Sequence, residues 1–351
     1  MELSDDEHKQ YSRHLLLDEV GVSGQLKLKN SKVLVVGAGG LGCPVLQYLT
    51  AAGVGTIGII DADTIEQSNL QRQILFTKSD IGRKKVTVAA SQLQALNPNV
   101  CFEMYAEYLT INNALALFEN YEIIVDGTDN FATRYLINDA AVLSNKPVVF
   151  GSIYKFSGQV SVFNYNYGPT YRCLYPNPPK SNAMSNCSDV GVLGVLPGII
   201  GCFQANEVIK IILGIGTVLS GTLLTFDALS MKQRLLHFEK NSEIAITSLS
   251  NDYAGFCGLD GDFVEISLEE YNTNATDYNV LDVRTEMERQ QLSMDSIHIP
   301  LDALGERWRE LPLGKNLLVF CASGVRSQKA IGILKEKGYK SALANLKGGF
   351  R

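Results

Sequence analysis

Charge is scarce in this sequence and nearly balanced. Of 351 residues, 31 are Lys or Arg and 37 are Asp or Glu, so the formal net charge at pH 7 is −6. Proteins that bind nucleic acid need a strong positive field or a basic patch. Neither is visible in the sequence, and we expect no nucleic-acid partner.

Segments that would direct the chain to a membrane or out of the cell are also missing. The N-terminus, MELSDDEHKQ, lacks the basic and apolar regions of a signal peptide. The most apolar stretch, residues 191–216, is interrupted by Gln204, Glu207 and Lys210, which are costly in a lipid-facing helix. We expect a cytoplasmic protein without a membrane partner, and we interpret this stretch as a helix packed in a core or a subunit interface.

Cysteine is too sparse for a disulfide framework. The seven cysteines are scattered over a long chain, and their number is odd, which favours thiol chemistry or burial in a reducing compartment. Cys43, Cys101 and Cys202 lie in apolar segments, and we expect them to be packing residues.

Apolar residues make up 46% of the chain, enough for more than one core. Short β-branched runs at residues 32–37, 56–61, 122–127 and 147–152 alternate with longer helix-like segments. This alternation predicts βαβ units on a parallel sheet. A second, shorter α/β series follows an irregular region around residues 241–262. We therefore predict an α/β protein in which residues 1–250 form a Rossmann-like doubly wound sheet with an extension and residues 262–351 form a small α/β domain.

A glycine-rich turn follows the first predicted strand. Its glycines are Gly37, Gly39, Gly40 and Gly42, and a turn of this kind lets backbone amides approach a phosphate at a helix N-terminus. Asp61 ends the next strand, where a carboxylate accepts hydrogen bonds from ribose hydroxyls. These residues alone fit a nicotinamide cofactor as well as ATP.

The next motifs favour ATP. The block SNLQRQ carries Asn69, Arg72 and Gln73, and GRKKV carries Lys84 and Lys85. Together they hold more cationic capacity than a pyrophosphate needs but suit a triphosphate.

A later strand end carries two more carboxylates and no histidine. Asp126 and Asp129 follow this strand, where a carboxylate can hold Mg²⁺ against phosphates. The histidines, which a dehydrogenase would use as acid or base, lie outside these motifs at His8, His14, His237 and His298. An NAD-binding oxidoreductase therefore remains only the less favoured alternative.

In these motifs, residues 1–238 resemble the family of MoeB, ThiF and the ubiquitin-activating enzymes. The segment from Tyr11 to His14, the GAGGLG turn, Asp61, the block 68–73, Lys85 and the turn 126–130 occur in the family's order and spacing. The resemblance implies ATP and Mg²⁺ as cofactors, with Asp129 at the magnesium. It further implies that Arg13 reaches into the site of a second subunit in a homodimer, although the residues alone favour a solvated face for Arg13. The nucleotide-binding residues implied are Gly37, Gly39, Gly40, Gly42, Asp61, Asn69, Arg72, Gln73, Lys85, Asp129 and Asn130.

The chemistry that these residues favour is attack of a carboxylate on the α-phosphorus of ATP. A carboxylate is already ionised at neutral pH, so positioning and charge neutralisation suffice without a general base. The product is an acyl-adenylate and the leaving group is pyrophosphate.

Cys321 opens a second motif, CASGVRS, between a buried run and a helical segment. A loop whose amides surround a sulfur, with Arg326 nearby, would stabilise a thiolate or persulfide. With Asp282 and Arg284 upstream, residues 263–351 resemble a rhodanese domain. Ala322 stands where many rhodaneses carry a polar or cationic residue, which argues against thiosulfate as donor. The segment ends early for this family, and we expect an abbreviated or truncated domain.

Two more cysteine positions bear on function. Cys187 lies in the Pro-, Asn- and Ser-rich segment 168–189, where sulfur-handling relatives place a reactive cysteine. Relatives also carry a structural zinc on two CxxC pairs, of which only Cys173 and Cys257 remain here. Two thiolates do not complete a tetrahedral site, so we predict that structural zinc is absent.

Together these motifs predict an enzyme of cofactor biosynthesis. It would adenylate the C-terminal Gly-Gly carboxylate of a ubiquitin-like sulfur carrier of the MoaD or ThiS type. Sulfur from a persulfide donor would then pass through Cys321, with Cys187 as a relay, to give a thiocarboxylate. In the alternative, the rhodanese-like domain is only a docking module.

Overall fold

The chain divides into two compact units, residues 1–253 and 254–351. The structure is a computed structural model and describes residues 2–178, 191–257, 263–291, 294–322 and 324–350.

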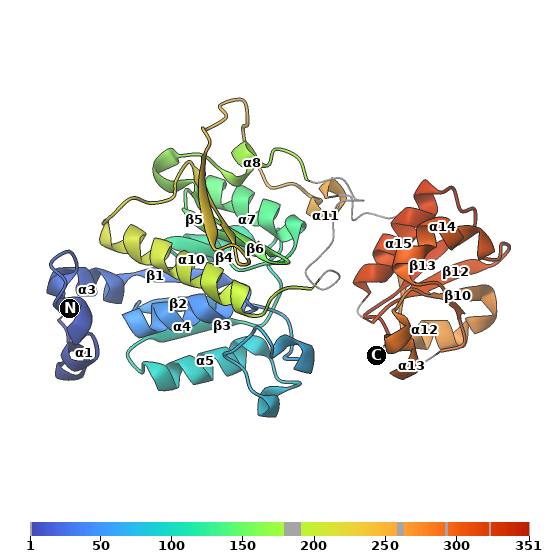
Figure 1. The fold of residues 1–351 in the computed structure, drawn as a ribbon, viewed down its shortest axis with the longest axis horizontal. Coiled ribbons are helices and arrows are strands. Elements are labelled where there is room, and N and C mark those ends of the chain that lie inside the picture. Colours follow the sequence, from blue (N-terminus) through green and yellow to red (C-terminus); the bar gives the residue numbers. More distant parts are fainter. Residues whose placement is uncertain (1, 179–190, 258–262, 292–293, 323, 351) are drawn as a thin grey trace. The chain divides into compact units, whose positions relative to one another are not determined.

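An eight-stranded sheet forms the centre of the first unit (Figure 1). Its strand order is β3-β2-β1-β4-β5-β6-β7-β8, with parallel pairing from β3 to β5 and antiparallel pairing from β5 to β8. The strands are β1 (Lys32–Val36), β2 (Thr56–Ile60), β3 (Cys101–Tyr105), β4 (Ile123–Asp126), β5 (Val148–Tyr154), β6 (Ser157–Phe163), β7 (Thr222–Asp227) and β8 (Lys232–His237).

Helices connect these strands and cover the sheet. The α-helices are α1 (Asp5–Gln10), α2 (Ser12–Leu15), α3 (Gly21–Asn30), α4 (Gly42–Ala52), α5 (Lys85–Leu96), α6 (Ala114–Glu119), α7 (Phe131–Leu143), α8 (Tyr171–Leu174) and α10 (Val195–Leu213). Short 3-10 helices are η1 (Gln67–Asn69), η2 (Lys78–Asp80) and η3 (Tyr165–Tyr167).

The parallel half of the sheet has the strand order 3-2-1-4-5 of a doubly wound fold, which confirms the predicted fold class. Val35 pairs with Ile59 on one side and with Val125 on the other, and all three side chains are buried. Such continuous β-branched runs are typical of strands covered on both faces. Because the strand order reverses between β1 and β4, the turns that follow these two strands lie beside each other, where α/β sheets bind ligands.

Helix α10 is the apolar stretch noted in the sequence. Among the described residues it is the one helix that is long and apolar enough to cross a membrane. It packs against α4, β5 and β6 (Figure 1). Its buried Gln204 donates from Nε2 to the carbonyl oxygens of Asp126 and Val149, at 2.8 and 3.1 Å. Gln204 therefore bonds to the sheet, while Glu207 accepts from the N–H of Leu219 and Lys210 donates to the carbonyl oxygen of Thr217, as expected for a core helix.

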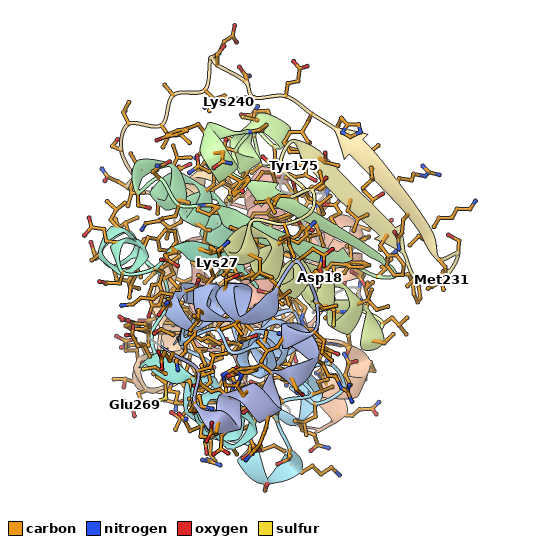
Figure 2. All side chains as sticks on the ribbon, turned by 90° about the vertical axis from the view of Figure 1, so that its left-hand side faces the viewer. Asp18, Lys27, Tyr175, Met231, Lys240 and Glu269 are labelled. Atoms are coloured by element: carbon orange, nitrogen blue, oxygen red, sulfur yellow. The ribbon has the colours of Figure 1, made fainter. Side chains whose placement is uncertain are left out.

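The antiparallel half of this sheet was not predicted. Strand β8 is exposed along its whole length, so it lacks the hydrophobic pattern that identified the parallel strands. Figure 2 shows the β7–β8 hairpin with Met231 at its tip. Strand β3 lies at the opposite edge, and the prediction that Cys101 packs in a core is wrong, because this residue is exposed at the start of that edge strand.

The second unit contains a five-stranded, wholly parallel sheet of order β11-β10-β12-β13-β9. Its strands are β9 (Val264–Ile266), β10 (Tyr278–Asp282), β11 (Ile297–His298), β12 (Asn316–Phe320) and β13 (Leu343–Leu346). Its helices are α12 (Leu268–Thr273), α13 (Glu286–Gln291), α14 (Leu301–Arg307) and α15 (Val325–Glu336), with η5 (Ala275–Asp277) and η6 (Trp308–Glu310); α11 (Tyr253–Phe256) lies at the junction of the units.

A buried arginine supports the end of this second sheet. The guanidinium of Arg284 donates to Asp282, with an Nη2–Oδ2 distance of 2.8 Å, and lies over the rings of Phe320 and Phe350. The backbone N–H of Phe350 donates to the carbonyl oxygen of Cys321 at 2.8 Å. The Asp282–Arg284 motif therefore stabilises the backbone on which Cys321 lies.

Two candidate active sites

The glycine-rich turn between β1 and α4 is a close-packed backbone cradle. Gly37 has a φ of +95°, which side chains other than glycine rarely adopt. A Cβ on Gly42 would lie 1.9 Å from the carbonyl oxygen of Gly37, so a side chain there would break the turn. Positions built on Gly39 and Gly40 lie beside the side chains of Gln73 and Arg72, at 3.8 and 3.4 Å. The side chains of Gln73 and Arg72 therefore lie against the glycine-rich turn.

Asp61 connects this turn to the next strand. Its two carboxylate oxygens accept hydrogen bonds from the backbone N–H groups of Ala38 and Asp63, each at 2.8 Å. Burial raises the pKa of Asp61, whereas the charge of Lys85 opposes this shift. Each oxygen keeps a lone pair, so the carboxylate can still accept from a ribose hydroxyl.

Lys85 is the central cation of the first site. Its ammonium lies 2.8 Å from Asp63 Oδ2, and its side chain is only 6% exposed. Burial acts to lower the pKa of Lys85, but the charges of Asp61 and Asp63, with a smaller contribution from Asp129, raise it overall. Lys85 is therefore ionised at neutral pH, paired with Asp63 and influenced by the charges of Asp61 and Asp129. Its neighbour Lys84 is exposed and donates to the carbonyl oxygen of Ala62.

The 68–73 block contains an unpaired buried acceptor. Asn69 Oδ1 accepts from the N–H of Glu66 at 3.2 Å and closes η1. Arg72 donates from Nη1 to the carbonyl oxygen of Ser68 at 3.1 Å. Gln73 is buried, and its Oε1 has no hydrogen-bond partner among the described residues. A buried amide without a partner is costly, so this side chain is suited to a ligand hydroxyl.

The turn after β4 separates the two aspartates that the sequence placed together. The buried Asp126 accepts from the N–H and hydroxyl of Thr128, at 2.9 and 2.6 Å, and burial raises its pKa. Asp126 therefore stabilises the turn and is not presented to a metal. Asp129 is exposed. Asn130 caps α7, because its Oδ1 accepts from the N–H of Thr133 at 2.9 Å.

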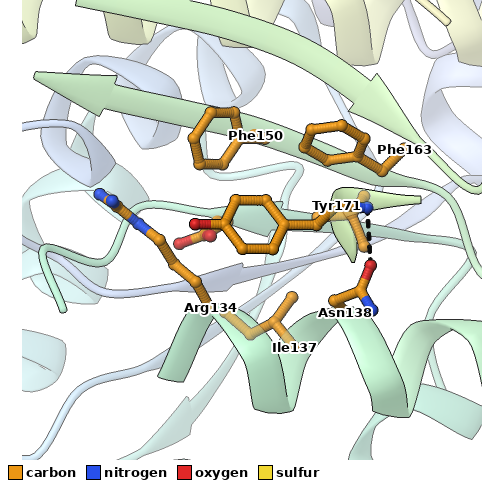
Figure 3. A pocket seen from close by; sticks show the side chains of 8 residues that line it. Arg134, Ile137, Asn138, Phe150, Phe163 and Tyr171 are labelled. Atoms are coloured by element: carbon orange, nitrogen blue, oxygen red, sulfur yellow. Dashed lines mark hydrogen bonds between the residues drawn. The ribbon is translucent and has the colours of Figure 1, made fainter. Parts of the chain in front are cut away.

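Arg134 is a residue of this region that the sequence analysis missed. It is buried beneath the turn and donates from Nη2 to the carbonyl oxygen of Thr128 at 3.0 Å, while its Nε has no partner among the described residues. Figure 3 shows Arg134, Asn138 and Tyr171 around a small cavity. Its volume is about 10 Å³, enough for about one water, so this cavity is not the substrate pocket.

Arg13 lies at the other end of α4. Tyr11, in the same segment, accepts from Asn97 at 2.8 Å, and its ring lies 2.5 Å from a Cβ built on Gly53, directly after α4. The helix spans Gly42–Ala52, about 16 Å at 1.5 Å per residue. Arg13 is exposed, and within the described residues no hydrogen bond or ion pair joins it to the glycine-rich turn.

The second candidate site is the loop between β12 and α15. The buried Cys321 sulfur accepts from the N–H of Gly324 at 3.1 Å. The hydroxyl of Ser327 lies 3.5 Å from the sulfur and 2.9 Å from the carbonyl oxygen of Gly324, between which its single proton is shared. Gly324 has a φ of +88°, which turns its amide toward the sulfur. Ser327 was missed by the sequence analysis, although it directly follows Arg326. The loop therefore directs a backbone N–H at the sulfur, and its role in sulfur chemistry stays a prediction.

Arg326 makes a bidentate ion pair with Glu288 on α13. Its Nη1 and Nη2 lie 2.8 and 2.5 Å from the carboxylate oxygens. Hydrogen bonding from Arg326 is the largest influence on Glu288 and lowers its pKa to about 2. Glu288 was also missed, because it lies 38 residues away in sequence.

The other cysteines that the sequence singled out are Cys187, Cys173 and Cys257. Cys187 lies outside the described residues. The sulfur of Cys173 accepts from the N–H groups of Thr170 and Asn241, at 3.4 and 3.3 Å. Cys257 is buried. The absence of structural zinc stays a prediction, which metal analysis of the purified protein would test.

Comparisons with known proteins find relatives for both domains. The ThiF family matches residues 11–245, and the rhodanese-like domain matches residues 267–351. A probable adenylyltransferase/sulfurtransferase MoeZ from Mycobacterium tuberculosis is 42% identical, covering 99% of this chain and 93% of that protein. The adenylyltransferase and sulfurtransferase MOCS3 of Anopheles gambiae is 43% identical, covering 94% of this chain and 82% of that protein.

A sulfur carrier protein adenylyltransferase from Thermus thermophilus is 48% identical, covering 74% of this chain and all of that protein. Among solved structures, the E. coli MccB complex with ATP has a TM-score of 0.56 at 21% identity, covering 70% of this chain and 82% of that one. The microcin C7 biosynthetic enzyme MccB with N-formylated MccA has a TM-score of 0.58 at 24% identity, covering 68% and 74%. The chain belongs to the ThiF family of adenylyltransferases and carries a rhodanese-like sulfurtransferase domain at its C-terminal end.

Proposed function

We propose that this enzyme uses ATP and Mg²⁺ to adenylate the C-terminal Gly-Gly carboxylate of a ubiquitin-like sulfur carrier protein, and that Cys321 then delivers sulfur to the activated carrier. The observation that supports the proposed adenylation is the cluster around Lys85. The buried Lys85 is paired with Asp63, and Asp61 accepts a hydrogen bond from Ala38 in the glycine-rich turn. The buried Gln73 amide lies beside Gly39, and its oxygen has no hydrogen-bond partner among the described residues. The proposed sulfur transfer is supported by the contacts of the Cys321 sulfur with the N–H of Gly324 and the hydroxyl of Ser327.

The residues of the first site fit a nucleoside triphosphate with a divalent cation. Lys85 and Arg72 would contact triphosphate oxygens, and Gln73 would bond a ligand hydroxyl. Asp129, exposed at the carboxyl end of β4, would hold Mg²⁺, since oxygen ligands are those that Mg²⁺ prefers. The metal would neutralise charge on the phosphates.

In the adenylation step, a carboxylate oxygen of the carrier attacks the α-phosphorus of ATP. The bond from that phosphorus to the bridging oxygen breaks, and pyrophosphate leaves with the electron pair. The cations of this chain stabilise the charge that develops, and this is the larger part of catalysis in reactions of this kind.

In the sulfur step, the outer sulfur of a Cys321 persulfide attacks the acyl carbon, and AMP leaves. The product is an acyl disulfide between carrier and Cys321. Attack of the Cys187 thiolate on the Cys321 sulfur would release the carrier thiocarboxylate. The Cys187–Cys321 disulfide formed in this way requires a thiol reductant before the next cycle. A persulfide donor then restores the persulfide on Cys321.

We further propose a homodimer in which Arg13 contributes to the site of the partner subunit. Within one chain, Arg13 lies about one helix length from the glycine-rich turn. An arginine so far from its own site can contact triphosphate only across an interface.

Carrier-dependent exchange of labelled pyrophosphate into ATP tests adenylation. We expect Asp129→Ala to slow exchange by about a hundredfold or more, whereas Glu119→Ala, which removes an exposed carboxylate at the end of α6, should not change it. Near-normal exchange in Asp129→Ala would contradict the assignment. Exchange with ATP also separates this proposal from an NAD-binding oxidoreductase.

A further inference from the structure

Arg326, five residues after Cys321 in the same motif, is already paired with a carboxylate before any sulfur donor arrives. Arg326 lies in the first turn of α15, two residues after Gly324, whose N–H contacts the sulfur. Its guanidinium forms two parallel hydrogen bonds to Glu288, the strongest geometry for an arginine–carboxylate pair. The two side chains are only 19% and 33% exposed. The pair is therefore partly shielded from water.

The carboxylate of Glu288 is also held by Thr285, which lies directly before α13. Its Oε2 accepts from both the N–H and the hydroxyl of Thr285, each at 2.9 Å. The backbone N–H of Glu288 donates in turn to the Thr285 hydroxyl oxygen at 3.4 Å. The carboxylate therefore has four donors, two from Thr285 and two from Arg326. An incoming anion would have to compete with this arrangement to reach the guanidinium.

This arrangement matters for the choice of sulfur donor. Thiosulfate carries two negative charges, and the Cys321 thiolate would attack its outer sulfur, break the S–S bond and release sulfite. A persulfide donor loses its outer sulfur in the same way and releases a thiolate with one charge. A free arginine beside the sulfur would favour the dianion, and a neutralised one gives no such advantage. Ala322, next to Cys321, supplies no cation in its place.

We propose that Glu288 is a specificity-determining residue of the second domain, which neutralises Arg326 and thereby directs Cys321 toward persulfide donors and away from thiosulfate. The inference rests on the proposed sulfur transfer by Cys321. It assigns to Glu288 a role in recognition of the donor and not in the attack itself.

The test compares two donors on the full chain, with cyanide as acceptor and thiocyanate as the measured product. The donors are thiosulfate and N-acetylcysteamine persulfide, which carries no charge besides its persulfide. We expect Glu288→Gln to shift the ratio of kcat/KM values toward thiosulfate by about tenfold, because screening at a partly exposed site weakens the full Coulomb effect. Glu310→Gln is the matched control, since Glu310 makes a bidentate pair with Arg307 outside the Cys321 loop.

A double-mutant cycle shows whether the shift requires the arginine. If Glu288 acts through charge on Arg326, Glu288→Gln/Arg326→Gln loses the gain for thiosulfate. A ratio unchanged within twofold in Glu288→Gln, or a gain that persists in the double variant, would overturn the inference while leaving sulfur transfer intact. Wild-type protein that transfers sulfur from neither donor would instead contradict the proposed function, and the inference with it.

Discussion

Lys85→Met offers the sharpest test of the nucleotide site, because the side chain keeps its length and loses its charge. Lys85 is buried and paired with Asp63, and a triphosphate would replace Asp63 as its partner. Removing one preorganised contact of this kind typically slows the reaction by about a hundred- to a thousandfold, or roughly 2.7 to 4 kcal/mol. We expect a loss of that size in pyrophosphate exchange.

The structure predicts a much smaller effect of the same change on stability. Asp63, the direct partner, is 51% exposed, so water can solvate its carboxylate when Lys85 is removed. Ion pairs with an exposed partner contribute about 0 to 1 kcal/mol, which corresponds to only a few degrees in Tm for a unit of this size. Activity and stability should therefore separate clearly.

The assay is carrier-dependent exchange with Lys84→Met as the matched control. Lys84 is the preceding residue, and its ammonium donates to a backbone carbonyl at the surface. We expect exchange in Lys84→Met within about threefold of wild type, since exposed charges contribute little. Two results would refute the reasoning: exchange in Lys85→Met within tenfold of wild type, or equal losses in both variants.

Three further predictions concern the second site and the support of the first. Cys321→Ala should keep pyrophosphate exchange and lose thiocarboxylate formation from a persulfide, with partial rescue by free sulfide, as followed by mass spectrometry of the carrier; loss of exchange would show that Cys321 acts earlier. Asp139→Asn should destabilise the first unit by about 3 to 5 kcal/mol in urea unfolding followed by circular dichroism, because it breaks a buried pair with Arg172 and a bond from Tyr253; a change below 1 kcal/mol would contradict this. Because the pKa of Glu288 lies at about 2 instead of 4.5, its stabilising effect is present above pH 4.5 and lost as pH falls toward 2. Unfolding followed by the fluorescence of the single tryptophan, Trp308, should therefore show the stabilities of wild type and Glu288→Gln converging over that interval. A constant difference in stability would count against the ion pair.

Much of the first site could be predicted because its residues follow strands of a parallel sheet. Gly37 and Asp61 come directly after β1 and β2, and Asp129 lies in the turn after β4; a doubly wound sheet brings those three ends together. The orientation of the Asp126 carboxylate could not be predicted in this way. It ends the same strand as the motif predicts, but its carboxylate turns back to Thr128, and a local side-chain bond of this kind is not visible in sequence spacing.

Residues that act through a contact between separate elements could not be predicted. Glu288 and Arg326 belong to different helices, and nothing in either segment alone indicates their pairing. The antiparallel strands were missed for a different reason. Strand β8, of sequence KQRLLH, is exposed on both faces, so only its pairing with β7 defines it, and pairing between strands is a tertiary property.

Both sites hold their main cation with a carboxylate, yet the two carboxylates differ in how easily a ligand can replace them. Asp63 is half exposed, and besides Lys85 its carboxylate accepts only a long contact from Tyr108 at 3.4 Å in the described chain. Glu288 has two further donors from Thr285 and a bidentate arginine. A triphosphate with several charges can therefore displace Asp63 and take over Lys85, because the released carboxylate returns to water at little cost. A small anion at the second site would leave a partly buried carboxylate with half of its donors lost, and such losses are expensive. The Lys85–Asp63 pair thus favours exchange with an anionic ligand, whereas the Arg326–Glu288 pair disfavours it.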